Sequence, residues 1–390
     1  MYDNKIVVLR GADRVRKRPA VVFDADDCSG AFKAFEMLLD FLSTEGLSGN
    51  TKHISVTVFE DNSICLYSAD RGMIIDETII DNKPAWFYDF CELYAGEKFK
   101  IDALKNDSGK KHKDFYGESE KTLPKYYNDG DLGFSLCCVQ YCTEFMEVYS
   151  VRDGEKKSLY FEKGNVCGDL KREASIETSG TCFKFKLDSE VFSDINIPSE
   201  WLLDLLEEKA VTVPGVTFEL KDLRNKCSKS FYYENGVLDY VKSASDVNIP
   251  LFDKSLEATG KDRYDRPEYN AKVRVILGFT NHPPKVKCFH NHRELKMGGT
   301  HLEKVKENIA YEISRFLNNK PIDEIVPFEE ISKNLVLAIE TYSSSSSFKN
   351  ALKNSLDSTM ITDMAHDLVW DNLYSYLKEN CDKILAVVER

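Results

Sequence analysis

Apolar residues in this chain follow two different periods, and the two alternate along the sequence. Between residues 30 and 45 they recur at steps of three and four, which is the pattern of an amphipathic helix. Residues 54–59 and 63–67 are short β-rich runs, and the polar residues 60–62 between them predict the turn of a β-hairpin. A chain that changes period in this way is expected to form layers of helices and sheet, an α/β fold.

The rest of the chain continues this alternation. We expect strands at residues 139–151, 156–162, 181–187, 271–279 and 286–289, with a turn at 152–154. One helix is expected to begin at Pro198 and run to about residue 210, with Ser199 as its N-cap. Another is expected to open at Thr300, with Val305, Ile309, Ile313 and Phe316 on one face, and residues 360–388 are expected to be mostly helical. The polar residues 100–128 and the serine run at 343–347 predict surface loops.

Length and composition narrow the class of protein. At about 150 residues per domain, 390 residues suggest two or three domains, and we place a boundary near Asn235 and Gly236. The net charge of −13 argues against a protein that coats nucleic acid over its whole surface. Eleven cysteines without a C-x-x-C pair indicate reduced thiols in a cytoplasmic protein. No apolar run is long enough to predict a membrane span.

A series of short motifs stands in a fixed order along the chain. It consists of residues 9–19, residues 61–63 followed by Arg71 and Gly72, residues 95–99, 179–181 and 231–236, and residues 298–302 with Cys288 and Phe289 upstream. They resemble, in the same order, motifs of the ATPase region of type IIA topoisomerases. Residues 9–19 resemble its opening segment, residues 61–63 with Arg71 and Gly72 its hairpin and first glycine motif, and residues 95–99 its A-G-G-K-F motif. Residues 179–181 resemble its T-G-T strand, residues 231–236 its F-x-Y-E-G-G junction, and residues 298–302 its G-G-T-H-L motif. That family includes DNA gyrase B and its topoisomerase IV counterpart. The resemblance covers essentially the whole chain.

The resemblance implies both a fold and a set of partners. Residues 1–234 would form a Bergerat (GHKL) sandwich of helices over a mixed sheet, and residues 235–390 a ribosomal-protein-S5-like transducer domain. ATP and Mg²⁺ would be the ligands and a homodimer the working form. A topoisomerase cleavage subunit is a further expected partner, with DNA contacted only indirectly. No motif of a DNA-cleaving domain follows, so we expect the chain by itself not to cut DNA, whether it is a fragment or a stand-alone relative.

In that family one helix carries F-E-x-x-D-N, where the Glu is the general base and the Asn, four residues later on the same face, holds the metal. Here residues 35–41 read F-E-M-L-L-D-F, and two registers are open. The shifted register makes Glu36 the catalytic base and Asp40 the metal ligand. The register without a gap puts Met37 and Phe41 at these positions and leaves a dead site. We prefer Glu36 and Asp40, because this register sends the apolar residues to apolar positions and does not bury an unpaired carboxylate.

The adenine site of the family reads D-x-G-x-G, and this chain departs from it. Ser68 stands where the Asp is expected, Asp70 replaces the first glycine, and Gly72 is retained. A hydroxyl accepts a hydrogen bond less strongly than a carboxylate does. Asp70 and Gly72 could take over the role through a local shift, and this alternative stays open. Thr181, from the T-G-T strand, is the further residue expected at the base.

The phosphates are expected to lie against two other segments. Gly130 and Gly133 remain from the family's glycine-rich loop and would cradle phosphate through their backbone N–H groups. Asp129 and Asp131 beside them would repel phosphate. Lys349, just after the serine run, aligns with the family's Q-T-K loop and is the residue expected to sense the γ-phosphate, against the alternative of a solvated surface lysine.

Two functional hypotheses follow. The first is an ATP-binding, dimerising clamp in which hydrolysis is weak or absent, because the departures fall at nucleotide contacts while the scaffold motifs persist. The second is an interaction protein, a catalytically degenerate relative that regulates or mimics a topoisomerase. His290, His292 and His301 lie close in sequence, and we expect them to be surface and turn histidines rather than metal ligands.

Overall fold

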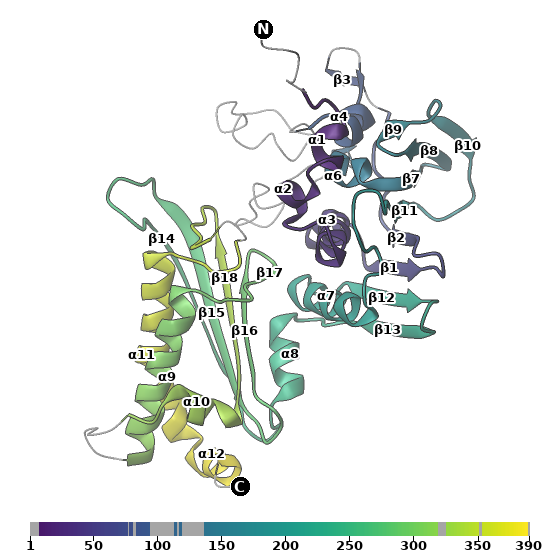
Figure 1. The fold of residues 1–390 in the computed structure, drawn as a ribbon. Coiled ribbons are helices and arrows are strands. Elements are labelled where there is room, and N and C mark those ends of the chain that lie inside the picture. Colours follow the sequence, from purple (N-terminus) through teal and green to yellow (C-terminus); the bar gives the residue numbers. More distant parts are fainter. Residues whose placement is uncertain are drawn as a thin grey trace. The chain divides into compact units, whose positions relative to one another are not determined.

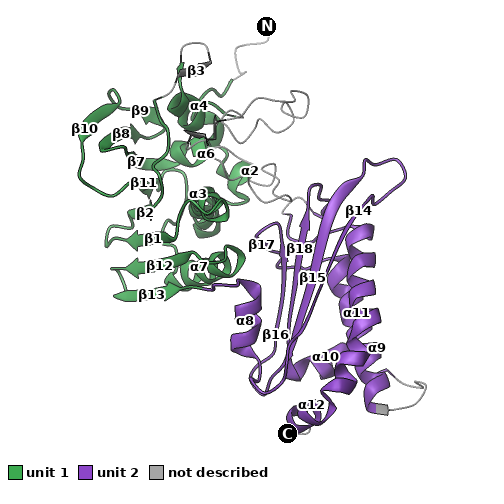
Figure 2. Ribbon diagram, turned by 180° about the vertical axis from the view of Figure 1, so that it is seen from behind, with its two compact units in different colours: residues 1–123, 129–232 green, residues 124–128, 233–390 purple. Residues whose placement is uncertain are grey.

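The computed structural model describes residues 8–76, 78–80, 83–93, 113–114, 117–118, 136–318, 325–350 and 353–388. The chain divides into two compact units, named here unit 1 (residues 1–123 and 129–232) and unit 2 (residues 124–128 and 233–390) (Figure 2).

Unit 1 is built on a mixed sheet, which has nine strands among the residues described. The strands run in the order β10-β8-β7-β11-β2-β1-β12-β13, and β9 pairs with β8 (Figure 1). β1 and β12 are parallel, and the other neighbours are antiparallel. Their bounds are β1 (His53–Val58), β2 (Ile64–Ser68), β7 (Thr143–Arg152), β8 (Glu155–Glu162), β9 (Asn165–Val166), β10 (Lys171–Ala174), β11 (Gly180–Leu187), β12 (Thr217–Asp222) and β13 (Cys227–Phe231). Two short pairs, β3 (Thr78–Ile80) with β4 (Lys83–Pro84) and β5 (Lys113–Asp114) with β6 (Gly117–Glu118), lie outside this sheet.

The helices of unit 1 lie against one face of the sheet, with α3 beside α7 (Figure 1). They are α1 (Asp13–Arg16), α2 (Pro19–Phe23), α3 (Cys28–Leu47), α4 (Ala85–Cys91), α6 (Leu136–Tyr141) and α7 (Ser199–Thr212). α3 begins where the Asp27 side chain accepts a hydrogen bond from the Ser29 N–H. Its apolar face, including Phe35, Leu38 and Leu42, is fully buried, so the predicted helix and its apolar side are confirmed.

Two local predictions in unit 1 are wrong. The expected strand at 139–151 begins only at Thr143, because residues 136–141 form the helix α6, in which every side chain is buried. Tertiary packing therefore overrides the β-rich pattern of this short segment. Ser199 does not cap α7: Pro198, in an extended conformation, takes the N-cap position, and the Ser199 hydroxyl donates to Asp222 Oδ2 at 2.7 Å.

Unit 2 is built on a second mixed sheet, with strand order β14-β15-β18-β16-β17 among the residues described. Its elements are α8 (Val237–Ala244), β14 (Phe252–Gly260), β15 (Tyr269–Phe279), β16 (Lys285–His290), β17 (Arg293–Glu294), α9 (Thr300–Asn318), α10 (Phe328–Ile331), a 3-10 turn (Ser332–Asn334), β18 (Leu335–Ser343), α11 (Thr359–Glu379) and α12 (Cys381–Val388). α9 and α11 cover one face of the sheet and α8 the other (Figure 1). The helices expected from Thr300 and over residues 360–388 are thereby confirmed.

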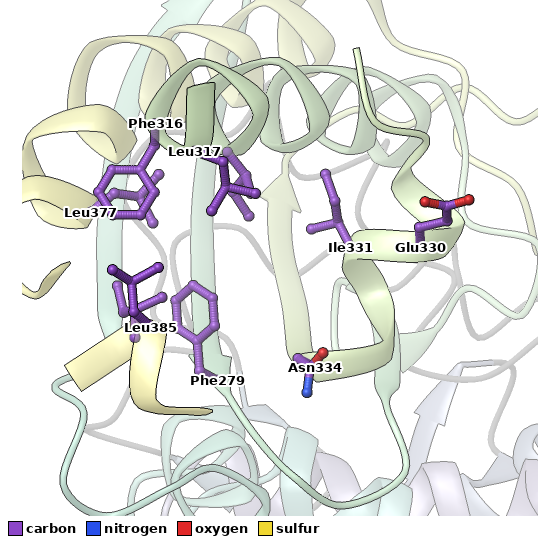
Figure 3. Close-up of a pocket in the computed structure, with 10 residues that line it drawn as sticks. Phe279, Phe316, Leu317, Glu330, Ile331, Asn334, Leu377 and Leu385 are labelled. Carbon is purple, nitrogen blue, oxygen red and sulfur yellow. The ribbon is translucent and has the colours of Figure 1, made fainter. Parts of the chain in front are cut away.

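The core of unit 2 lies between its sheet and the pair α9 and α11. Val305 and Ile309 of α9 meet Val273 and Val275 of β15 in one buried cluster. Towards α12 the packing leaves a cavity of about 60 Å³, lined almost entirely by apolar side chains such as Phe279 (Figure 3). This is room for a few water-sized groups. In the part of the chain that the structure describes, no helix combines the length and the hydropathy needed to cross a bilayer.

The N-cap of α11 gives a first test of this packing. Ser358 Oγ accepts from the Ile361 N–H and lies 2.8 Å from Asp262 Oδ1, to which it donates. We expect Ser358→Ala to lower the free energy of unfolding by about 1–2 kcal/mol, measured by urea denaturation. Ser345→Ala, at an exposed position of the neighbouring loop, is the control and is expected to change it by less than about 0.5 kcal/mol. Equal effects of the two substitutions would contradict the capping role.

Candidate functional site

The ends of two central strands bring four predicted residues together, named here the anchor cluster: Ser68, Asp70, Gly72 and Thr181. Thr181 of β11 pairs with Ser68 of β2. Asp70 Oδ1 accepts hydrogen bonds from Thr181 Oγ1 at 3.0 Å and from the Gly72 N–H at 2.7 Å. The side chains of Ser68, Asp70 and Thr181 are all buried. Asp70 therefore joins the ends of β2 and β11, and its use in place of the family's aspartate through a local shift stays a prediction.

Ser68 is the last residue of β2 and belongs to this cluster. It lies on the same face of β2 as Leu66 and Ile64, the face that the helices cover. Among the described residues its hydroxyl is fully buried and has no hydrogen-bond partner. Leaving a buried polar group unsatisfied costs about 1–3 kcal/mol. A ligand that offered a hydrogen bond here would recover that cost, which makes Ser68 a candidate contact.

Asp40 and Lys209 form a buried ion pair between α3 and α7. Lys209 Nζ lies 2.8 Å from Asp40 Oδ1. The Lys209 side chain is 2% exposed and the Asp40 side chain is 6% exposed. Charges this deeply buried are tolerated only when they are paired. The sequence analysis does not identify Lys209. The signal is nevertheless present, since Lys209 continues the apolar stripe of Leu202, Leu205 and Leu206 along α7.

Phe41, the next residue of α3, points to a different side of the helix. Its ring packs edge-on against Phe183 of β11, with 5.9 Å between centroids. Phe183 lies two residues beyond Thr181 and also contacts Phe90 of α4, which in turn packs against Phe161. We name these four rings the phenylalanine row. Side chains one residue apart on a helix diverge by about 100°, so Asp40 faces α7 while Phe41 faces the strand of the anchor cluster.

Glu36 lies one turn before Asp40. Its carboxylate is 2.6 Å from Lys33 Nζ, and its side chain is 18% exposed. No described contact joins Glu36 to the anchor cluster. The catalytic role of Glu36 and the metal role of Asp40 thus stay predictions, and the side occupied by Phe41 favours the gap-free register, in which Phe41 holds the metal position.

The residues present do not fit a magnesium ion at Asp40. Mg²⁺ prefers oxygen ligands, but the Asp40 carboxylate already holds an ammonium at 2.8 Å, and a divalent ion beside it would be repelled. Within the described ranges, no group of three or more His, Cys, Asp or Glu side chains is arranged to hold a metal ion.

The remaining predicted contacts are only partly described. Gly130 and Gly133 lie outside the described residues. Lys349 lies in unit 2 on an exposed loop after β18, where its N–H donates to the Ser355 carbonyl at 2.9 Å. The loop is also tied down by an isolated bridge between Phe348 and Leu356. The role of Lys349 at a γ-phosphate stays a prediction.

The histidines of unit 2 are not all at the surface, contrary to expectation. His290 is buried between Thr341 Oγ1 at 2.9 Å and Ser346 Oγ at 2.7 Å, and His301 Nε2 lies 3.6 Å from Cys288 Sγ. Burial lowers the pKa of both histidines to about 3. They are therefore neutral at physiological pH, and His290 packs against the loop that carries Lys349 through Ser346 and Phe348.

Comparison with known proteins agrees with this architecture. Residues 236–390 match the family model described as DNA gyrase B. The DNA gyrase B of Thermotoga maritima is 26% identical over 88% of this chain and 52% of its own length, and the corresponding DNA topoisomerase 4 chain of Enterococcus faecalis is 26% identical over 100% and 54%. The chain is homologous to the ATPase-transducer region of gyrase B and its topoisomerase IV counterpart. This gyrase B-like chain spans about half the length of the curated relatives it matches.

Solved structures show the same fold. The 43K ATPase domain of Thermus thermophilus gyrase B, solved with an aminocoumarin, has a TM-score of 0.65 at 20% identity and covers 97% of this chain and 93% of that one. The gyrase B structure of Myxococcus xanthus gives 0.66 at 16% identity, covering 96% and 99%. The expected fold, a GHKL sandwich followed by a transducer domain, is confirmed.

The ion pair can be tested by removing one partner. Lys209→Met takes away the ammonium and leaves the Asp40 carboxylate buried, so we expect it to lower the free energy of unfolding by about 3–5 kcal/mol. Asp40→Leu combined with Lys209→Met is expected to recover most of that loss. Lys33→Met, at the more exposed pair with Glu36, is the control and is expected to cost less than about 1 kcal/mol. Urea denaturation of the four proteins measures this, and equal costs for the two lysines would refute the assignment.

Gly72 can be tested against a matched glycine. Gly72 has φ +74°, and a Cβ there would overlap the Val151 carbonyl and approach Ser150 Oγ within 2.7 Å. Gly154 has φ +77°, but its Cβ would meet only the Ser175 carbonyl at 3.9 Å. Gly154→Ala is expected to cost about 1–2 kcal/mol for the left-handed backbone alone. We expect Gly72→Ala to cost clearly more in thermal denaturation, and a similar cost would show that the turn after Asp70 is not closely packed.

Proposed function

We propose that this chain is a gyrase B-like ATPase and transducer unit that binds ATP, dimerises as a clamp and hydrolyses ATP weakly or not at all. The observation that carries the proposal is the divergence of Asp40 and Phe41 on α3. The Asp40 carboxylate is paired with Lys209, and the Phe41 ring packs against Phe183 of β11, two residues beyond Thr181.

The anchor cluster supports retained binding of a base. Asp70 brings a carboxylate to Thr181 and Gly72 at the strand ends, and Ser68 adds an unsatisfied hydroxyl next to it. The exocyclic amino group of adenine could donate a hydrogen bond to the Asp70 carboxylate or to the Ser68 hydroxyl. The carboxylate is the stronger acceptor, which would compensate in part for the serine at the family's aspartate position.

The environment of Glu36 supports weak or absent hydrolysis. A general base must reach the attacking water and be able to take its proton. The Glu36 carboxylate is held by the Lys33 ammonium, 2.6 Å away, and no described contact joins it to the anchor cluster. Asp40, paired with the Lys209 ammonium at 2.8 Å, does not fit a magnesium ion. Lys349 would supply positive charge to a bound phosphate without completing a catalytic set.

A second candidate is a regulatory or interaction protein that binds no nucleotide. The phenylalanine row favours it, because Phe90, Phe161 and Phe183 are completely buried and Phe41 is only 6% exposed. Four buried rings in contact are a core that a purine would have to displace. In both candidates the working form is a homodimer, and a topoisomerase cleavage subunit would be the partner, with DNA reached through that partner.

A nucleotide experiment separates the candidates. We expect a non-hydrolysable ATP analogue to raise the melting temperature and to shift the protein to a dimer in light scattering, while Mg²⁺-dependent phosphate release stays at background. Thr181→Val removes the hydroxyl that bonds Asp70 and is expected to weaken analogue binding by about tenfold, the effect of about 1.4 kcal/mol. Ser193→Ala, at an exposed position of the same unit, is the control and should bind as the unchanged protein does.

The other outcomes contradict the proposal in different ways. Turnover that Glu36→Gln abolishes would establish the shifted register and an active enzyme. Absence of any binding would favour the interaction protein. In that case Phe41→Ala, which removes a ring that packs against Phe183 of β11, should open room for a base and produce adenosine binding detectable by calorimetry.

A further inference from the structure

Two cysteines face each other on the surface of the unit 1 sheet that the helices do not cover. Cys65 of β2 and Cys182 of β11 have their sulfur atoms 3.3 Å apart. The strands are antiparallel neighbours in which Cys65 pairs with Lys184 and Cys182 pairs with Tyr67, so the cysteines are diagonal neighbours on one face. Both are free thiols. A disulfide of about 2.05 Å would need the sulfur atoms to approach by a little over an ångström.

The two thiols differ in access to solvent. Cys65 is half-buried, whereas Cys182 is fully buried. Cys182 pairs with Tyr67 on one side and with Tyr149 of β7 on the other, and both tyrosines are partly exposed on this face. An oxidant arriving from solvent therefore reaches Cys65 first, and Cys182 is held behind it.

The two thiols also differ in acidity. The hydrogen bond with Cys182, together with the Lys184 ammonium, lowers the pKa of Cys65, although burial opposes this. The same hydrogen bond and burial raise the pKa of Cys182. Thiolates are the nucleophiles in thiol chemistry. Cys65 is thus suited to react first with an oxidant, and Cys182 is suited to attack the oxidised Cys65 sulfur afterwards.

We propose that Cys65 and Cys182 form a redox-active dithiol site, in which a hydroperoxide oxidises Cys65 and Cys182 then closes a disulfide. The Cys65 thiolate attacks a peroxide oxygen, the O–O bond breaks, and a sulfenic acid and one water form. Cys182 sulfur attacks Cys65 sulfur, and the hydroxyl leaves as a second water, so that two thiols and one hydrogen peroxide give one disulfide and two waters.

The site lies next to the anchor cluster but does not depend on it. Cys182 directly follows Thr181, and Cys65 lies three residues before Ser68 on the paired strand. A disulfide would tie β2 to β11 covalently beside the ends that hold Asp70. The oxidation chemistry needs no nucleotide, so its outcome is independent of the proposed clamp function.

Mass spectrometry of the full chain tests the proposal. After brief treatment with equimolar hydrogen peroxide and quenching with catalase, we expect the protein to lose two hydrogen atoms, and a non-reducing digest to contain the Cys65 and Cys182 peptides linked. Dithiothreitol should reverse the link. Cys182→Ser should stop the reaction at a sulfenic acid on Cys65, trapped by dimedone, while Cys65→Ser should give no linked peptide.

Cys227→Ser is the matched control, since Cys227 is also half-buried on a strand of this sheet, and it should leave the link unchanged. Two results would overturn the proposal. One is a wild-type protein whose Cys65 is oxidised to sulfinic acid, or not at all, without linkage to Cys182. The other is a Cys65 that reacts with peroxide no faster than Cys227, measured by differential alkylation.

Discussion

The rotation of α3 about its own axis sets which of its side chains face the strands of unit 1 and which face α7. Phe35, Leu38 and Leu42 are completely buried against the rest of unit 1, and this fixes which way every other side chain of the helix points. Once they are buried, Asp40 must face α7 and Phe41 must face β11. The chemistry available at the strand ends follows from this packing rather than from the residue types alone.

The Asp40–Lys209 pair shows how that rotation is stabilised. A buried carboxylate would need a cation, and the pair supplies one from within the chain at 2.8 Å. The same contact satisfies Asp40 and makes it a poor ligand for a second cation. Because breaking the pair would leave a charge unpaired in a low-dielectric interior, the pair helps to fix the rotation of α3.

Periodicity predicts the elements well where it is long, and fails where tertiary contacts compete. The 30–45 helix, the 54–67 hairpin and the helix from Thr300 are each set by many apolar residues, so a single contact cannot overturn them. Residues 136–141 are too short for their pattern to outweigh burial, and they form helix α6 instead. Ser199 does not take its expected cap role because it is the first residue inside the helix, and its hydroxyl accepts from Asn225 Nδ2 while donating to Asp222, both distant in sequence.

The sequence predicts which residues meet at the candidate site better than it predicts which way their side chains point. Ser68, Asp70, Gly72 and Thr181 meet because strand pairing places them together, and a series of motifs along the chain can anticipate that. The two registers of α3 differ by one residue, which is a rotation of about 100° about the helix axis. Sequence spacing leaves open whether the side that faces the strand ends carries Glu36 and Asp40 or Met37 and Phe41. The partner of Asp40 bears on this choice, and Lys209 is recognisable as that partner only once α7 is placed beside α3.

In unit 2, backbone contacts connect the loop that carries Lys349 to the start of helix α9. The Lys349 loop is fastened through the Ser355 carbonyl and the Phe348–Leu356 bridge, while Gly299 bridges Leu356 at the start of α9. Movement of this loop would thus be felt by a long helix that packs on the sheet. In the proposed clamp, a response to binding would need only this loop and its anchor, whereas Asp40 is paired with Lys209 and Phe41 faces β11.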